Sequence, residues 1–244
     1  MVNIKLTIEY DGTNYHGWQR QNNAKTIQET IEKAIRGLTG EEIDLIGSSR
    51  TDYGVHAYGI AANFITHSKI PGDRFSYALN RLLPDDIVIR KSEEVSMDFH
   101  SRYMAKGKRY RYLIYNSKFP SAILRNRAYH MSYDLDTQKM EKASLYLLGT
   151  HDFSAFKASG SSVKTSVRTI TSVSLKKNED IITFEIAGDG FLYNMVRIIV
   201  GTLVDVGMER IDPGSIPYIL ESLDRKKAGR TAPAMGLYLV EVYY

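Results

Sequence analysis

The sequence predicts an α+β fold, because two runs of elements with the same order follow one another along the chain. Each run is expected to give a strand, a helix, two strands, a helix and a strand, which is the β-α-β-β-α-β order of a ferredoxin-like (split β-α-β) unit. Only the order recurs, since the halves share no clear sequence repeat. The length of 244 residues suffices for one large domain or two small ones. We therefore predict two tandem subdomains, 1–104 and 105–244, whose antiparallel sheets pack into one extended sheet with a central cleft.

The elements of the first half follow from alternation, capping and breakers. Residues 2–10 alternate apolar and polar side chains, which predicts a half-buried strand. Thr26 and Glu29 form a capping box before a helix with one apolar face, and Gly40 lies just past its end. The other elements expected here are strands at 43–46, 57–66 and 87–95 and a helix from Pro71-Gly72 to residue 82.

The second half is interpreted in the same way. A strand is expected at 106–116, and a helix capped by Asp134 or Asp136 runs to residue 148. Strands at 167–177 and 181–188 form a hairpin across Asn178-Glu179-Asp180. The remaining elements expected are a helix at 193–206, a short helix after Pro213 and a closing strand at 236–242.

Composition excludes several classes of site. The chain has no cysteine, so disulfides, thiolate metal sites and a thiol nucleophile are impossible. Its six histidines show no metal-ligand spacing, and we expect no metal and no cofactor. No apolar run is long enough to cross a bilayer and no signal-peptide pattern begins the chain, so we expect a cytoplasmic protein without a membrane partner.

Positive charge is concentrated in one stretch rather than spread evenly. The net charge is only +4, but residues 99–133 hold eight Lys or Arg, six Tyr and no acid. Uncompensated basic stretches are typical of phosphate-binding surfaces, and tyrosines offer faces for unpaired bases. We therefore predict an RNA partner. The alternative is a solvated basic face without a partner.

The loop 47–57 is the strongest candidate for a reactive site. It carries a guanidinium on Arg50, a carboxylate on Asp52 and an imidazole on His56 between two apolar segments. Loops of this kind present reactive groups on a scaffold. The alternative is an ordinary Asp/Gly turn.

Two further groups carry candidate residues. Arg197 lies in a helix that is apolar nearly all round, so its charge needs a partner, for which Asp52 is the candidate, or it reaches the surface at the helix start. In the strand Lys108-Arg109-Tyr110-Arg111-Tyr112, the two arginines share one face and the two tyrosines the other. The tyrosine pair is either core or a stacking surface for a base.

The loop 10–21 contains the only tryptophan of the chain. Trp18, Gln19 and Arg20 are candidate RNA contacts on a mobile loop. Alternatively, Trp18 fixes the loop to its own subdomain. His16 and His56 lack metal-like companions, and both are expected to be structural.

Six segments in order resemble the tRNA pseudouridine synthase A family over nearly the whole chain. They are Tyr10-Asp11-Gly12 with Gly17-Trp18-Gln19-Arg20-Gln21, Arg50-Thr51-Asp52-Tyr53-Gly54-Val55-His56-Ala57, Asp98-Phe99-His100-Ser101-Arg102, Arg109-Tyr110-Arg111-Tyr112, Phe191 with Met195-Val196-Arg197 and Gly201, and Gly236-Leu237-Tyr238-Leu239. Ser49 and Tyr53 depart from the family pattern, which usually has glycine at the first position and alanine or lysine at the second.

The resemblance implies a homodimer that isomerises uridine to pseudouridine at positions 38, 39 and 40 of the tRNA anticodon stem-loop. It implies that Asp52 is the catalytic nucleophile, that Arg197 pairs with it and that Tyr110 stacks on the target uracil. It also implies that Arg50 helps displace or replace the flipped base and that Leu237 lines the pocket. Lys108, Arg109 and Arg111 are expected to contact RNA.

The chemistry leaves alternatives open. Asp52 attacks ribose C1′ or base C6, or assists elimination to a glycal, and the sequence does not choose among these routes. Two rival functions are a non-catalytic ferredoxin-like RNA-binding protein and a hydrolase that uses Asp52 on a small substrate. The first would need neither Asp52 nor Arg197, and the second leaves the basic, tyrosine-rich stretch unexplained.

Overall fold

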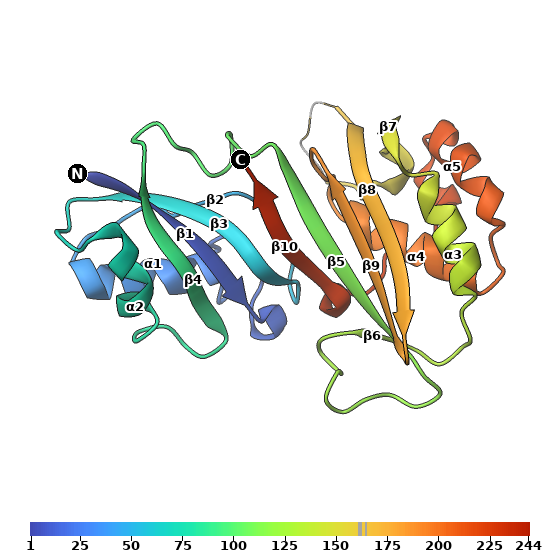
Figure 1. Ribbon diagram of the computed structural model, residues 1–244, viewed down its shortest axis with the longest axis horizontal. Coiled ribbons are helices and arrows are strands. Elements are labelled where there is room, and N and C mark those ends of the chain that lie inside the picture. Colours follow the sequence, from blue (N-terminus) through green and yellow to red (C-terminus); the bar gives the residue numbers. More distant parts are fainter. Residues whose placement is uncertain (161–162, 164) are drawn as a thin grey trace. The chain divides into compact units, whose positions relative to one another are not determined.

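The computed structural model describes residues 1–160, 163 and 165–244, and its contacts divide the chain into two compact units (Figure 1). The first unit comprises residues 1–106 and 238–244, and the second comprises residues 107–237. Each unit combines a β-sheet with helices, which confirms the predicted α+β class.

The sheet of the first unit is centred on β1 (Val2–Tyr10). β1 pairs antiparallel with β3 (His56–Thr66) on one side and with β4 (Ile87–Val95) on the other. The short β2 (Ile46–Gly47) pairs antiparallel with β3, and β10 (Leu237–Tyr243) pairs parallel with the start of β3. The predicted alternation in β1 is confirmed, because Ile4, Leu6 and Ile8 are fully buried.

Helix α1 (Ile27–Thr39) begins and ends at the predicted signals. The Thr26 side chain accepts a hydrogen bond from the Glu29 N–H, and Gly40 adopts a left-handed conformation with φ of +76°. A left-handed residue at this position is easiest for glycine, which has no Cβ. The apolar face of α1 is buried in the first unit.

Two predictions in the first unit are wrong in length. The expected helix 72–82 is a 3-10 turn followed by α2 (Phe75–Leu79), because the Asn80 side chain pairs with both backbone groups of Ile89. The expected strand 43–46 is reduced to Ile46–Gly47. Leu45 instead bonds to side chains of α1: its N–H donates to Glu32 Oε1 and its carbonyl accepts from Gln28 Nε2.

The sheet of the second unit has the order β5 (Gly107–Asn116), β9 (Ile181–Gly188), β8 (Val167–Asn178) and β7 (Gly149–Asp152), with antiparallel neighbours. β6 (Tyr129–Met131) pairs parallel with β5. The predicted β8–β9 hairpin is confirmed, whereas β6 and β7 were not predicted because both are too short to show a period.

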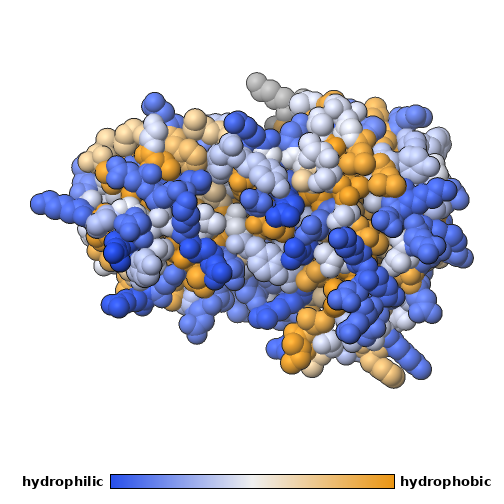
Figure 2. All heavy atoms as spheres, in the orientation of Figure 1, coloured by the Kyte–Doolittle hydropathy of each residue, from blue (hydrophilic) through white to orange (hydrophobic). Residues whose placement is uncertain are grey.

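The helices of this unit are α3 (Thr137–Leu145), α4 (Met195–Gly207) and α5 (Ile216–Ser222). Asp136, rather than Asp134, caps α3 by accepting from the Lys139 N–H at 3.0 Å. α4 is buried around most of its circumference, as its composition predicts. Figure 2 shows that apolar residues form only small separate groups on the visible surface.

Candidate functional site

Asp52 lies in the loop 47–57 of the first unit, between β2 and β3. Its side chain is half-buried, and its carbonyl accepts the Val55 N–H at 3.2 Å, which closes a turn. Gly54 supplies the positive φ, +74°, that this turn needs. Arg50 is exposed on the same loop. The loop therefore offers a carboxylate and a guanidinium on a defined backbone.

The loop 10–21 fixes the backbone on both sides of Asp52. The Trp18 N–H donates to the Thr51 carbonyl at 3.1 Å, and the Gly54 N–H donates to the Tyr15 carbonyl at 3.4 Å. The hydroxyls of Tyr10 and Thr51 form a hydrogen bond of 2.8 Å. These contacts hold Thr51 on one side of Asp52 and Gly54 on the other, both from the same neighbouring loop.

Glycine allows these two loops to approach so closely. A Cβ at position 12 would lie 1.9 Å from the Val55 carbonyl oxygen. A Cβ at position 17 would lie 2.2 Å from the Thr51 carbonyl oxygen, and Gly17 also has a φ of +81°. This role of the two glycines is not evident from the sequence, although both stand in the segments that carry the family resemblance.

His56 is a buried structural residue, in agreement with expectation. Its ring is 2% exposed, and Nδ1 accepts the Gly12 N–H at 3.0 Å. Nδ1 also lies 3.1 Å from Asp11 Oδ1. The ring stacks on Tyr238 at 4.7 Å, and Tyr238 in turn stacks on Tyr58.

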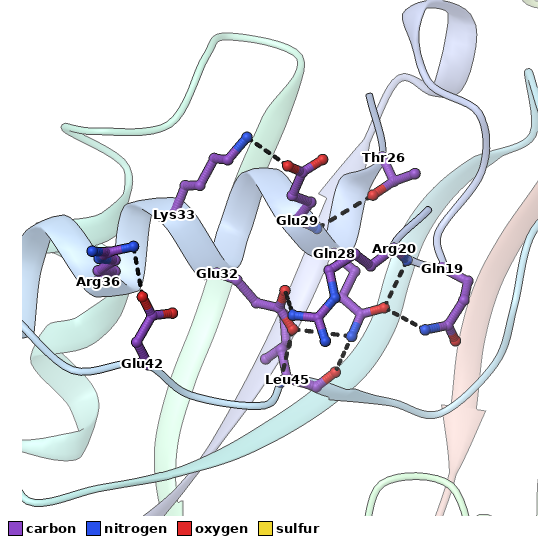
Figure 3. A network of polar contacts seen from close by, with 10 residues as sticks. All are labelled: Gln19, Arg20, Thr26, Gln28, Glu29, Glu32, Lys33, Arg36, Glu42 and Leu45. Carbon is purple, nitrogen blue, oxygen red and sulfur yellow. Dashed lines mark hydrogen bonds and ion pairs between the residues drawn. The ribbon is translucent and has the colours of Figure 1, made fainter. Parts of the chain in front are cut away.

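The structure corrects the interpretation of Trp18. Its side chain is 1% exposed, so it holds the loop in the core of the first unit and presents no face to a base. Gln19 and Arg20 also contact their own unit (Figure 3): Gln19 Nε2 donates to Gln28 Oε1 at 2.8 Å, and Arg20 Nη1 lies 3.0 Å from Glu32 Oε2. The Glu32 side chain is only 9% exposed, whereas that of Arg20 is 56% exposed and remains accessible to solvent.

Tyr110 and Tyr112 are buried residues on the same face of β5. Tyr110 is 7% exposed and meets the Phe191 ring edge-to-face at 5.0 Å. Tyr112 is fully buried, and its hydroxyl donates to the Pro233 carbonyl at 2.6 Å. Burial raises the pKa of Tyr112 well above its usual value, and the positive charge of Arg197 acts in the opposite direction. Tyr112 is therefore a core residue.

Arg197 occupies the first turn of α4, where its guanidinium is held in one orientation. Nε donates to the Ala232 carbonyl and Nη1 to Asn194 Oδ1, each at 2.8 Å. Gly201 brings the segment 228–233 against the helix, since a Cβ there would lie 1.7 Å from the Arg230 carbonyl oxygen. The side chain is half-buried. This fixed orientation differs from an arginine that simply extends into solvent.

The positive charge of β5 is partly compensated, which corrects the picture of an uncompensated basic face. Arg111 binds Glu185 Oε1 through Nε and Nη2, both at 2.7 Å, and Arg109 Nη1 lies 3.9 Å from Glu185 Oε2. Glu185 belongs to β9, so the acid was invisible in the sequence of 99–133. Lys108 stands opposite Gly188 in the same strand pair.

The predicted site residues thus form two groups, one in each unit. The first unit holds Asp52 and Arg50 beside the loop 10–21, and the second holds Tyr110, Arg197 and Leu237, which is 7% exposed. The pairing of Asp52 with Arg197 stays a prediction. Asn194, which no sequence signal marks as a site residue, stands directly before α4 and contacts Arg197.

Over residues 1–160, 163 and 165–244, no helix has the length and apolarity that a membrane span requires. The same part of the chain contains no group of three or more His, Asp or Glu side chains placed to hold a metal ion.

Comparison with known proteins gives a consistent result. A family model described as tRNA pseudouridine synthase matches residues 6–104 and 143–244. A protein of Acetivibrio thermocellus named tRNA pseudouridine synthase A is 73% identical over 244 residues, and one of the same name from Ruminiclostridium cellulolyticum is 60% identical over 245. Both matches span 100% of this chain and 100% of the relative. A chain in the crystal structure of a Cbf5-Nop10-Gar1 complex matches with a TM-score of 0.36 and 11% identity. The match covers 96% of this chain and 57% of the other chain, and a TM-score this low carries no argument.

Proposed function

The chain belongs to the tRNA pseudouridine synthase family, and we propose that Asp52 is the nucleophile with which it isomerises uridines 38, 39 and 40 of the tRNA anticodon stem-loop. As a member of that family it is an isomerase that converts uridine to pseudouridine in tRNA. The observation that carries the assignment of Asp52 is its loop, whose backbone is fixed on both sides by hydrogen bonds from the loop 10–21.

The reaction needs no second substrate. The bond between N1 of the base and C1′ of the ribose breaks, the base turns, and a bond between C5 and C1′ forms. The C5 proton leaves and N1 gains a proton, so the change is redox-neutral. A carboxylate that adds to C1′ or to C6, or that assists elimination to a glycal, is sufficient to start this sequence. The three routes differ in the atom that Asp52 attacks.

The second unit is proposed to hold the everted base. Taking a base out of its stack costs a few kcal/mol. Stacking on Tyr110 at about 1–3 kcal/mol offsets part of this cost. Leu237 provides an apolar wall and Arg50 occupies or helps to open the space that the base leaves. Arg197 is proposed to pair with Asp52, and its fixed guanidinium supports a role that demands a defined orientation.

We extend the proposal to fold and partners. Within residues 1–104 the strands pair in the order β4-β1-β3-β2, all antiparallel, which supports a ferredoxin-like unit in the proposed subdomain 1–104. The proposed second subdomain, 105–244, includes β10, whose residues 238–243 belong to the first unit and pair parallel with β3. The proposed partners are tRNA and a second copy of this chain in a homodimer, in the cytoplasm. Gln19, Arg20, Lys108, Arg109 and Arg111 remain the proposed RNA contacts, through side chains that are at least partly exposed.

The test uses tRNA labelled with tritium at C5 of uracil, because the label is released only when C5 bonds to C1′. Asp52→Ala and Asp52→Asn should bind tRNA close to the wild-type level and release no label. Release by either variant above the protein-free background would overturn the role of Asp52. Mapping pseudouridine in tRNA from cells that lack this protein tests the positions. Positions 38, 39 and 40 should then carry unmodified uridine, and pseudouridine still present there would contradict the proposed sites.

A further inference from the structure

Tyr53 follows Asp52 directly and is an exposed aromatic residue on a fixed backbone. It is 60% exposed. It lies within the turn that the Val55 N–H and the Asp52 carbonyl close. Single exposed aromatic side chains are common on protein surfaces and need no explanation by themselves. Tyr53 differs from such residues because it lies directly beside the proposed reactive carboxylate.

A second ring keeps Tyr53 in place. The His16 ring is exposed and lies 5.0 Å from the Tyr53 ring, tilted by 55°. The His16 backbone is fixed, since its N–H donates to the Lys25 carbonyl at 2.9 Å and its carbonyl accepts from Gln21 Nε2 at 3.1 Å. Gly17 then brings this loop against Thr51. The two rings therefore form an aromatic pair on segments whose backbone is already ordered before a ligand binds.

We propose that Tyr53 stacks on the base of the nucleotide that flanks the target uridine, and that His16 is its positioning residue. This inference rests on the proposed role of Asp52. Tyr53 follows Asp52 directly and is exposed, so it is placed to meet an RNA strand whose target nucleotide lies at Asp52. Since Tyr110 is proposed to stack on the reacting base, we assign the flanking base to Tyr53. Aromatic rings stack on all four bases, because every base has a π-face. Tyr53 thus adds affinity for an RNA strand opened around its target.

The size of the effect follows from stacking energies. Base–aromatic stacking contributes about 1–3 kcal/mol, which corresponds to a roughly 5- to 150-fold change in affinity. Tyr53→Ala should therefore raise KM for tRNA within this range and leave kcat within about threefold, because the flanking contact exists before and during the reaction. Tyr53→Phe should resemble the wild type, and His16→Ala should give a smaller rise in KM.

The matched control is Tyr77→Ala. Tyr77 lies on α2 of the same unit, is 69% exposed and has the guanidinium of Arg74 over its ring. Its removal changes composition and exposure in the same way as Tyr53→Ala, but at a site remote in sequence from Asp52. We expect unchanged KM and kcat. A rise in KM equal to that of Tyr53→Ala would show that loss of any surface tyrosine is enough, and would overturn the proposal.

The decisive experiment combines the variants with altered RNA. Full-length tRNAs are prepared with an abasic nucleotide on the 5′ or the 3′ side of the target uridine. The wild type should lose affinity for one of the two, and Tyr53→Ala should bind that tRNA and the intact tRNA equally, so that the two changes are not additive. Full additivity on both sides, or no loss by the wild type on either, would overturn the proposal.

The outcomes separate this inference from the proposed function. Label release by Asp52→Asn refutes the role of Asp52 and with it the premise. An inactive Asp52→Asn together with a normal Tyr53→Ala refutes the stacking role alone. Thermal unfolding of each variant is measured in parallel, and the wild-type arm with abasic tRNA requires no variant to fold.

Discussion

Replacing Gly12 by alanine tests whether the loop 10–21 positions Asp52. Gly12 has an ordinary φ, so the change is purely steric. The new Cβ would lie 1.9 Å from the Val55 carbonyl oxygen, whereas real Cβ contacts are essentially never closer than 3.0 Å. The two segments must therefore separate by at least about 1.1 Å, and a misplacement of about 1 Å in a catalytic site costs on the order of 100-fold in rate.

The same separation weakens the fold by a smaller amount. Overpacking costs about 1–3 kcal/mol, and the bond from the Gly12 N–H to His56 Nδ1 lengthens as well. Gly12→Ala should thus remain folded at 25 °C while its single-turnover rate of tritium release falls by about two orders of magnitude. Stability is followed by urea unfolding, with Trp18 as the only tryptophan and therefore the sole source of indole fluorescence.

The control is Gly37→Ala, within α1. A Cβ at position 37 meets no atom within 4 Å, so this variant should gain about 0.5–1 kcal/mol from reduced backbone freedom and keep full activity. The reasoning would be refuted if Gly12→Ala turned over within about threefold of the wild type. It would also be refuted if its loss of activity merely matched the fraction of unfolded protein.

Three further changes give separate readouts. Tyr112→Phe removes the hydrogen bond to the Pro233 carbonyl and should cost about 0.5–1.5 kcal/mol of stability at pH 7. Because burial raises the folded-state pKa of Tyr112, the stabilisation is fully present below about pH 10, the pKa of an unfolded tyrosine, and is lost as the pH rises above it. Urea unfolding between pH 8 and 11 should therefore show a shallower alkaline loss of stability in the variant, and an unchanged loss would contradict the assignment. Glu32→Ala leaves the buried Leu45 N–H without its acceptor, whereas Gln28 Nε2 keeps the Leu45 carbonyl. The change should cost about 1–3 kcal/mol in urea unfolding, and a neutral effect would show that the polar network in Figure 3 is dispensable. Asn194→Gly keeps the left-handed backbone, at φ +59°, but removes the side-chain oxygen that accepts from Arg197 Nη1. We expect kcat to fall with little change in melting temperature. An unaltered kcat would mean that this hydrogen bond does not position Arg197.

Signals that act within a few residues predicted much of the fold. The capping box at Thr26 and the left-handed Gly40 set the ends of α1, and alternation placed β1 and the β8–β9 hairpin. Errors arose where a distant side chain bonds to the backbone. The backbone of Leu45 forms hydrogen bonds with the side chains of Gln28 and Glu32 of α1 instead of with a neighbouring strand, and no local sequence pattern reveals these bonds.

The candidate site shows the same limit. Asp52 and Arg197 stand out in the sequence because a charged group in an apolar or glycine-rich setting is unusual. What holds them does not stand out: the acceptors of Arg197 include the carbonyl of Ala232, which any residue could supply. The compensation of Arg109 and Arg111 by Glu185 was equally hidden, since strand pairing rather than sequence proximity brings these charges together.

The parallel pairing of β10 with β3 has a consequence for synthesis on the ribosome. Tyr238 and Leu239 align with His56 and Ala57, yet residues 107–237 must be translated between the two strands. A nascent chain that has emerged only to residue 106 carries β3 without this neighbour, so the ring of His56 has not yet met Tyr238. The segment that follows Asp52 therefore cannot complete its pairing until residues 238 and 239 have left the exit tunnel.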